Sequence, residues 1–304
     1  MRIGIPKGLM YWKYGYMVED YLKELGIDYI VSPNTDKEIL DRGVNCCVDE
    51  ACLPIKVFHG HVDWLKDKCD LIVVPRIMQI KKDEFICPKF CGIIEMLKSS
   101  IDNLPKLTEM PIYAFNEKNL FNWFLSISES CTSKNKSKEA FRKIRTIEKV
   151  HQKIDNKNFN INVALLGHPY SISDEFCNMN IERKLKSMDF NVFTEENVRE
   201  DIIDEEIKTL FKKPFWTFAR RSYGAAMYLY HTKAVDGMIY ISSFGCGIDS
   251  VVIELIREQL GDFPFMIIKI DEHTGEAGLD TRIEAFKDML ERRNLNEGEL
   301  PKLG

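Results

Sequence analysis

The chain has 304 residues and a formal net charge of −5, with 45% hydrophobic and 29% charged residues. This length favours two domains that each bury a core, and the composition is that of a globular protein rather than a disordered one. The acidic balance offers no basic footprint for nucleic acid, and no run of about 18 apolar residues is present to cross a membrane.

The first half alternates short apolar runs with helical patterns. Strands are predicted at 2–5, 28–32, 70–77 and 110–116, and helices at 11–25, at 36–42 and from residue 53. The helix at 11–25 is expected to end at Gly26. Strands that alternate with helices indicate a parallel sheet covered on both faces, and the run at 110–116 is assigned to that same sheet.

A polar, basic stretch separates the halves. Residues 120–158 are rich in Ser, Lys and Asn and are predicted to form a helical connector with a solvated, positively charged face. The expected domains are therefore 1–119, which carries most of the cysteines, and 159–304.

The second half repeats the α/β pattern. Each of four segments begins with a strand, and a helix is expected at 249–260; the four segments are 160–170, 191–197, 237–247 and 265–276. Ligands of open α/β sheets bind beyond the carboxyl ends of the strands. That rule directs attention to residues 76–91, His168, Cys246 and residues 271–276.

The nine cysteines are expected to be reduced. The N-terminal apolar run is broken at once by Pro6, Lys7 and Gly8, which is unlike a signal peptide and predicts a cytoplasmic protein. In that compartment cysteines serve metal binding or redox chemistry more often than disulfides.

Three loops place cysteines beside Gly, Pro or the start of a helix: VDEACLP with Cys52, FICPKFCG with Cys87 and Cys91, and SSFGCGID with Cys246. Backbone N–H groups at a helix start favour an anionic group such as a metal cluster. The alternative is that these cysteines pack as small hydrophobic residues, which is our interpretation of Cys69, Cys131 and Cys177. Zinc is a second alternative, but no C-x-x-C pair is present.

Several strings carry a family resemblance: IGIPKGLMYWKY, SPNTDKEIL, VDEACLPIKVFHGHV, VPRI, ICPKF, SSFGCGIDS and DEHTGEAGLDTRIEAF. Over residues 2 to about 290 the chain resembles proteins related to the 2-hydroxyacyl-CoA dehydratases and their activases (DUF2229-like), which are also related to double-cubane cluster proteins. The connector at 120–158 carries none of this resemblance.

The resemblance implies two flavodoxin-like or Rossmann-like domains with an iron–sulfur cluster in the cleft between them. By position the cluster ligands would be Cys52, Cys87 and Cys246, which leaves one iron of a 4Fe–4S cluster open to a non-cysteine ligand. The additional Cys46, Cys47 and Cys91 raise the alternative of an 8Fe–9S double cubane held by all six cysteines.

The loop at 271–276 (DEHTGE) is a candidate for acid–base chemistry. Glu272 and His273 are the predicted catalytic residues, and the alternative is a hydrogen-bonded loop that braces its neighbours. His59 and His61 are interpreted as packing residues. Arg220 and Arg221 are candidates to pair with an anionic cluster or a phosphate, or to form surface salt bridges.

The function implied by the resemblance is a low-potential, single-electron reduction of a small substrate or an acyl-CoA. The electrons would come from a separate ATP-dependent iron–sulfur activase, because this chain has no G-x-x-x-x-G-K-[ST] motif. Two alternatives remain open, a non-catalytic electron carrier or cluster-holding subunit, and a metal-free ligand-binding module. The relatives also suggest a homodimer.

Overall fold

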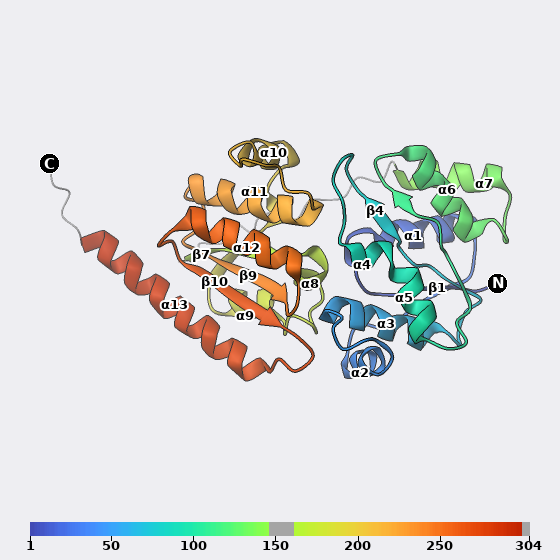
Figure 1. The fold of residues 1–304 in the computed structure, drawn as a ribbon, viewed down its shortest axis with the longest axis horizontal. Coiled ribbons are helices and arrows are strands. Elements are labelled where there is room, and N and C mark those ends of the chain that lie inside the picture. The colour runs from blue at the N-terminus through green and yellow to red at the C-terminus, as the bar shows by residue number, and fades with distance from the viewer. Residues whose placement is uncertain (146–160, 300–304) are drawn as a thin grey trace. The chain divides into compact units, whose positions relative to one another are not determined.

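The computed structural model describes residues 1–145 and 161–299 and divides them into two compact units (Figure 1). Unit 1 comprises residues 1–145, 169–177 and 214–218, and unit 2 comprises 161–168, 178–213 and 219–299. The boundary predicted near residue 159 lies outside the described residues, as does the end of the predicted connector from 146 onward.

Unit 1 is built on a four-stranded parallel sheet in the order β2-β1-β3-β5. Its strands are β1 (Ile3–Ile5), β2 (Tyr29–Val31), β3 (Leu71–Ile72) and β5 (Lys106–Leu107). The described residues of unit 1 also form eight helices: α1 (Tyr11–Leu25), α2 (Lys37–Cys46), α3 (Leu53–Leu65), α4 (Pro88–Cys91), α5 (Ile93–Ser100), α6 (Glu117–Ser128), α7 (Lys134–Arg145) and α8 (Pro169–Ser173). The core lies between sheet and helices, where Ile3, Phe58 and Ile72 are fully buried.

The run at 70–77 is two strands rather than one. β3 ends at Ile72, and β4 (Ile77–Gln79) pairs with β6 (Ile112–Tyr113) in a separate two-stranded parallel sheet. Pro75 lies between β3 and β4 and has no N–H for a ladder hydrogen bond, so the chain leaves the first sheet there. The prediction that segment 110–116 joins the main sheet is therefore wrong. The outer strand next to β3 is β5 instead.

Unit 2 is built on a second parallel sheet in the order β10-β9-β7-β8. Its strands are β7 (Ile161–Gly167), β8 (Phe190–Thr194), β9 (Gly237–Ser243) and β10 (Phe265–Ile270), and its helical segments are α9 (Ile181–Ser187), η1 (Glu195–Asn197), α10 (Glu200–Ile207), α11 (Thr217–His231), α12 (Gly247–Leu260) and α13 (Glu276–Glu299). All seven residues of β9 are buried, as expected for an inner strand covered on both faces.

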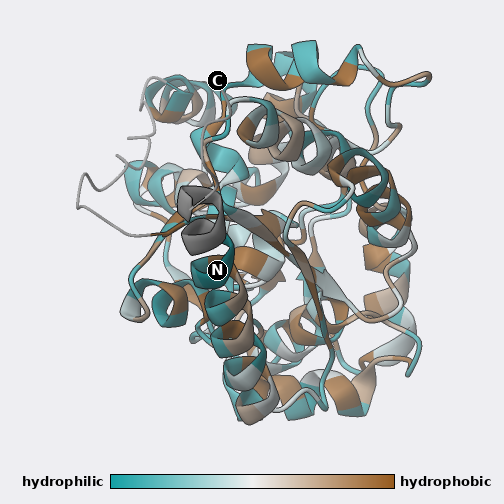
Figure 2. Ribbon diagram, turned by 90° about the vertical axis from the view of Figure 1, so that its left-hand side faces the viewer, coloured by the Kyte–Doolittle hydropathy of each residue, from teal (hydrophilic) through white to brown (hydrophobic). Residues whose placement is uncertain are grey.

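The helices of both units carry hydrophilic and hydrophobic bands (Figure 2), as expected where one face packs and the other meets solvent. Local signals set several of their ends. Gly26 ends α1 in the left-handed conformation at φ 65°, and its N–H donates to carbonyls of the last turn. The structure thus confirms an α/β fold with parallel sheets, while the cluster in an interdomain cleft stays a prediction. None of the described helices combines the length and apolar character that a membrane span requires.

Candidate metal centre

The three predicted cluster ligands occupy the same local position. Cys52, Cys87 and Cys246 are the residues directly before α3, α4 and α12, and no thiol among them caps its own helix. Proline lies in the first turn of α3 and of α4, where its missing N–H costs nothing. Each sulfur is therefore placed where backbone N–H groups without helical partners favour negative charge.

Unit 1 brings four of its cysteines into one neighbourhood. Cys52 acts electrostatically on both Cys47 and Cys87, and Cys91 acts on Cys87. We call Cys47, Cys52, Cys87 and Cys91 the unit 1 thiol group; all four are partly exposed and none is in a disulfide. Their residues come from the end of α2, the start of α3 and both ends of α4, so three chain segments contribute.

Burial raises the pKa of three members of the thiol group, Cys47, Cys87 and Cys91. Burial raises the pKa of Cys87, the backbone and charge of Lys89 lower it, and the nearby thiols of Cys52 and Cys91 raise it further. Burial likewise raises the pKa of Cys47, against lowering by Lys56 and Lys89. Thiolates crowded in this way are stabilised by a shared cation, which makes the donor set suited to a soft metal or an iron–sulfur cluster.

Three cationic side chains act electrostatically on members of the thiol group. Lys56 lies one turn after Cys52 in α3 and is 2% exposed, which is rare for lysine. Lys89 lies within α4, and the charge of Arg76 lowers the pKa of Cys91. A negatively charged group held by these thiols would have compensating positive charge nearby.

Cys46 differs from the thiol group. It is the last residue of α2, and its Sγ donates to the carbonyl oxygen of Gly43 at 3.7 Å. Burial, Asp63 and Cys47 together raise its pKa to about 11. Its assignment as an additional cluster ligand stays a prediction.

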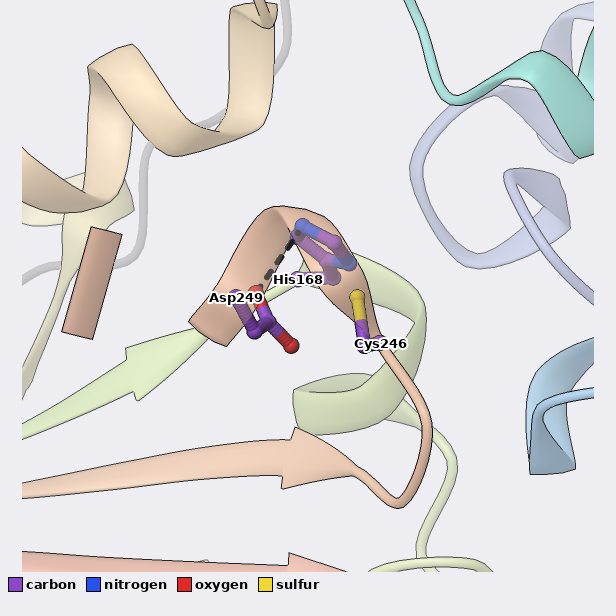
Figure 3. Close-up of side chains that lie close together, drawn as sticks. All are labelled: His168, Cys246 and Asp249. Atoms are coloured by element: carbon purple, nitrogen blue, oxygen red, sulfur yellow. Dashed lines mark ion pairs between the residues drawn. The ribbon is translucent and has the colours of Figure 1, made fainter. Parts of the chain in front are cut away.

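Unit 2 places two polar side chains beside Cys246. One ligand atom each from Cys246, His168 and Asp249 lies within 4.8 Å of the others, and Figure 3 shows the imidazole between the carboxylate and the sulfur. His168 Nε2 is 3.3 Å from Asp249 Oδ1, and the hydroxyl of Tyr240 donates to the same oxygen at 2.9 Å. His168 follows β7 and Asp249 lies in the first turn of α12, so the strand ends supply this trio.

Sequence reasoning singled out His168 only by its place after a strand, and it missed Asp249 and Lys56. The available signal was helical spacing: Asp249 is three residues after Cys246, and Lys56 is four residues after Cys52. Residues with these separations lie on the same face of a helix.

The predicted acid–base pair lies in a self-bonded loop. Glu272 Oε1 and His273 Nε2 are 4.0 Å apart, and the His273 side chain is 85% exposed. Asp271 accepts hydrogen bonds from Thr274 Oγ1 at 2.7 Å and from the His273 N–H at 3.0 Å. These contacts lie within the loop itself, so both a catalytic role for Glu272 and His273 and the bracing alternative stay predictions.

The remaining candidates are engaged within the fold. His59 and His61 are fully buried, and His61 lies between the hydroxyls of Ser32 and Thr35. Arg220 is 1% exposed and pairs with Asp204 at 2.8 Å, while Arg221 pairs with Glu195 at 3.3 Å. Of the cysteines predicted to pack, Cys177 is buried and Cys69 donates to the carbonyl oxygen of Leu65, but Cys131 is exposed, so that prediction is wrong for Cys131.

A family model described as the CoA enzyme activase uncharacterised domain (DUF2229) matches residues 2–198. The chain belongs to that family. The match agrees with the resemblance to acyl-CoA dehydratase activase-related proteins and spans the whole unit 1 thiol group; Cys246 lies beyond it.

No curated protein matches the chain. A transcription regulator like protein from Staphylococcus haemolyticus aligns at 9% identity and a TM-score of 0.24, over 89% of this chain and 95% of its own. A similarity at that level supports no statement about fold or function.

Proposed function

We propose that this family member binds an iron–sulfur cluster through Cys52, Cys87 and Cys246 and passes electrons to a small substrate or an acyl-CoA. A separate ATP-dependent activase is the proposed electron donor. The observation that supports the proposal most is the unit 1 thiol group, which gathers at the ends of α2, α3 and α4 near the buried Lys56. Membership of a CoA enzyme activase family supports the relation to acyl-CoA dehydratase systems.

In this proposal the chain's own residues hold and stabilise negative charge. The thiolates of Cys52 and Cys87 bind from unit 1 and that of Cys246 from unit 2, each with helix N–H groups beside it. Lys56 and Lys89 oppose the negative charge near Cys47 and Cys87. His168, held by Asp249, lies beside Cys246. When bound, the cluster would carry single electrons, and an iron without a thiolate could act as a Lewis acid.

The test is the iron and acid-labile sulfide content of anaerobically purified or reconstituted full chain. We expect about four irons per chain for a single cubane, with a broad thiolate-to-iron absorption band. Replacing Cys52, Cys87 or Cys246 by Ser should each remove most of the iron. Cys131→Ser is the matched control, because Cys131 is an exposed thiol outside the thiol group, and it should keep wild-type iron. Wild-type iron in all three variants would contradict the proposal.

The same measurement separates one cubane from two. A double cubane requires about eight irons with nine sulfides and a contribution from Cys46, Cys47 and Cys91. Serine at those three positions would then lower the iron to about half, whereas a single cubane would be retained.

A mononuclear site is the second candidate, favoured by the close trio of His168, Cys246 and Asp249. Zinc accepts this mixture of sulfur, imidazole and carboxylate ligands. Zinc held there would leave about one metal per chain, would be lost in His168→Gln, and would be indifferent to Cys52→Ser.

Catalysis is tested apart from cluster binding. Reconstituted protein is mixed with a reduced activase of this system and a panel of acyl-CoA esters. Conversion of a substrate supports the reductase, while reduction of the chain without conversion supports the alternative of an electron carrier.

A further inference from the structure

Unit 1 contains a cavity of about 300 Å³ that includes none of the proposed metal ligands. Ile5, Pro6 and Gly8 line it from the end of β1, and Val73 and Pro75 line it from the end of β3. The cavity therefore lies beyond the carboxyl ends of two adjacent parallel strands.

These two strands flank the switch point of the sheet. In the order β2-β1-β3-β5, the chain goes from β1 to β2 on one side and then crosses to β3 on the other side. The connections diverge at this point and leave a crevice, which is where open α/β sheets bind their ligands. The strand order thus supports a ligand-binding role for this cavity independently of the cavity's shape.

The walls of the cavity are mostly apolar. Aromatic rings from α1 and α6 and aliphatic side chains from β4 and β6 form most of the lining, including Tyr14, Ile77, Ile112 and Trp123. The hydroxyl of Tyr11 donates to Glu19 at 2.7 Å, so this residue offers its ring to the cavity rather than a donor. Such a surface suits an apolar body.

Among the described residues that line the cavity, Arg145 is the one with a charge. It is exposed, so it stands at the mouth rather than inside. A guanidinium in this position matches a carboxylate on an otherwise apolar ligand. The volume equals that of about ten water molecules in the liquid, at ~30 Å³ each, which is room for a small organic acid.

We propose that this cavity binds a small apolar carboxylic acid, aromatic or straight-chain, with its carboxylate at Arg145. The site is distinct from the thiol group and does not depend on a bound cluster. Phenylacetate and octanoate have the required size and charge, and phenylacetamide has the same shape as phenylacetate without the charge.

The test is isothermal titration calorimetry of the full chain with these three compounds. Both acids should bind saturably, and the amide about two- to five-fold more weakly than phenylacetate, the range expected for one solvent-exposed ion pair. Arg145→Gln should abolish the difference between acid and amide while the fold is kept, because the side chain is exposed. No saturable binding of either acid, or equal binding of acid and amide to the wild type, would overturn the proposal.

A second variant addresses the cavity itself. Ala114→Leu adds three carbon atoms to the lining and should weaken both acids about tenfold, whereas Ala277→Leu, on an exposed face of α13, should leave binding unchanged. Undiminished binding in a folded Ala114→Leu protein would place the ligand elsewhere. Iron content measured on the same variants should equal that of the wild type, so failure here is distinguishable from failure of the cluster proposal.

Discussion

At the scale of single residues, the unit 1 thiol group and the buried histidines differ in whether their side chains are available to bind a ligand. The four cysteines of the unit 1 thiol group are partly exposed, and Lys56 and Lys89 act on them electrostatically, so they are suited to an added ligand. His61 instead has its ring nitrogens 2.9 Å from Ser32 Oγ and 3.2 Å from Thr35 Oγ1, and Thr35 donates onward to Asp174 at 2.6 Å. This chain of hydrogen bonds leaves His61 no role as a metal ligand.

Protonation of His61 should destabilise unit 1. Burial lowers its pKa from 6.5 to about 3, with a smaller raising effect of Asp36 and a lowering effect of Lys7. Below pH 6.5 the His61 imidazole is protonated in the unfolded chain but stays neutral in the folded chain, so the free energy of unfolding falls as pH falls. Between pH 7.5 and pH 5 we expect His61 to account for a loss of about 2 kcal/mol in the free energy of unfolding.

Urea unfolding at the two pH values measures this loss. His61→Gln should show a pH dependence smaller by about that amount, with a remainder from the buried His59, whose pKa burial also lowers. His273→Gln is the control, since that side chain is 85% exposed. An unchanged pH dependence in His61→Gln would contradict this assignment.

At the scale of elements, the close contact of α2 and α3 positions the start of α3 and hence Cys52. A Cβ added at Gly43 would meet the carbonyl oxygen of Lys56, and one added at Gly60 would meet that of Ile39. The two backbones approach this closely because both contact positions are glycine.

Gly43→Ala should therefore separate the two helices. We expect a loss of about 1–3 kcal/mol in the free energy of unfolding, because the obstacle is backbone and cannot rotate away. Gly278→Ala is the matched control: it lies in α13 with open space around it and should be neutral or gain up to ~1 kcal/mol. Urea denaturation of both variants measures this loss. A Gly43→Ala protein as stable as the wild type would contradict the prediction, because it would show that α2 and α3 can move apart without cost.

At the scale of the whole molecule, the proposed ligands come from two units of separate sheets. A group bound only by the folded chain raises the midpoint of thermal unfolding. Anaerobic reconstitution with iron and sulfide should therefore raise the midpoint of the full chain. Cys52→Ser in unit 1 and Cys246→Ser in unit 2 should abolish the increase equally, as followed by circular dichroism under argon. A full increase in Cys246→Ser would assign the cluster to unit 1 alone.

Local pattern was sufficient for much of the architecture. The apolar runs at 2–5, 28–32 and 237–247 contain β1, β2 and β9, and Gly26 marks the end of α1. The cysteines at the starts of α3, α4 and α12 were also apparent, because Pro or Gly beside a strand-to-helix loop is a local signal. Such features depend on residues within a few positions of one another.

Only the tertiary structure decided the rest. It assigned 77–79 and 112–113 to a second sheet, brought His168 beside Asp249 across 81 positions of sequence, and formed the cavity between the ends of β1 and β3. These outcomes depend on which strands pair and which side chains meet across the fold. Which strands pair depends on the relative stability of alternative contacts between segments that are far apart in the sequence. A short window of sequence does not contain both partners of such a contact.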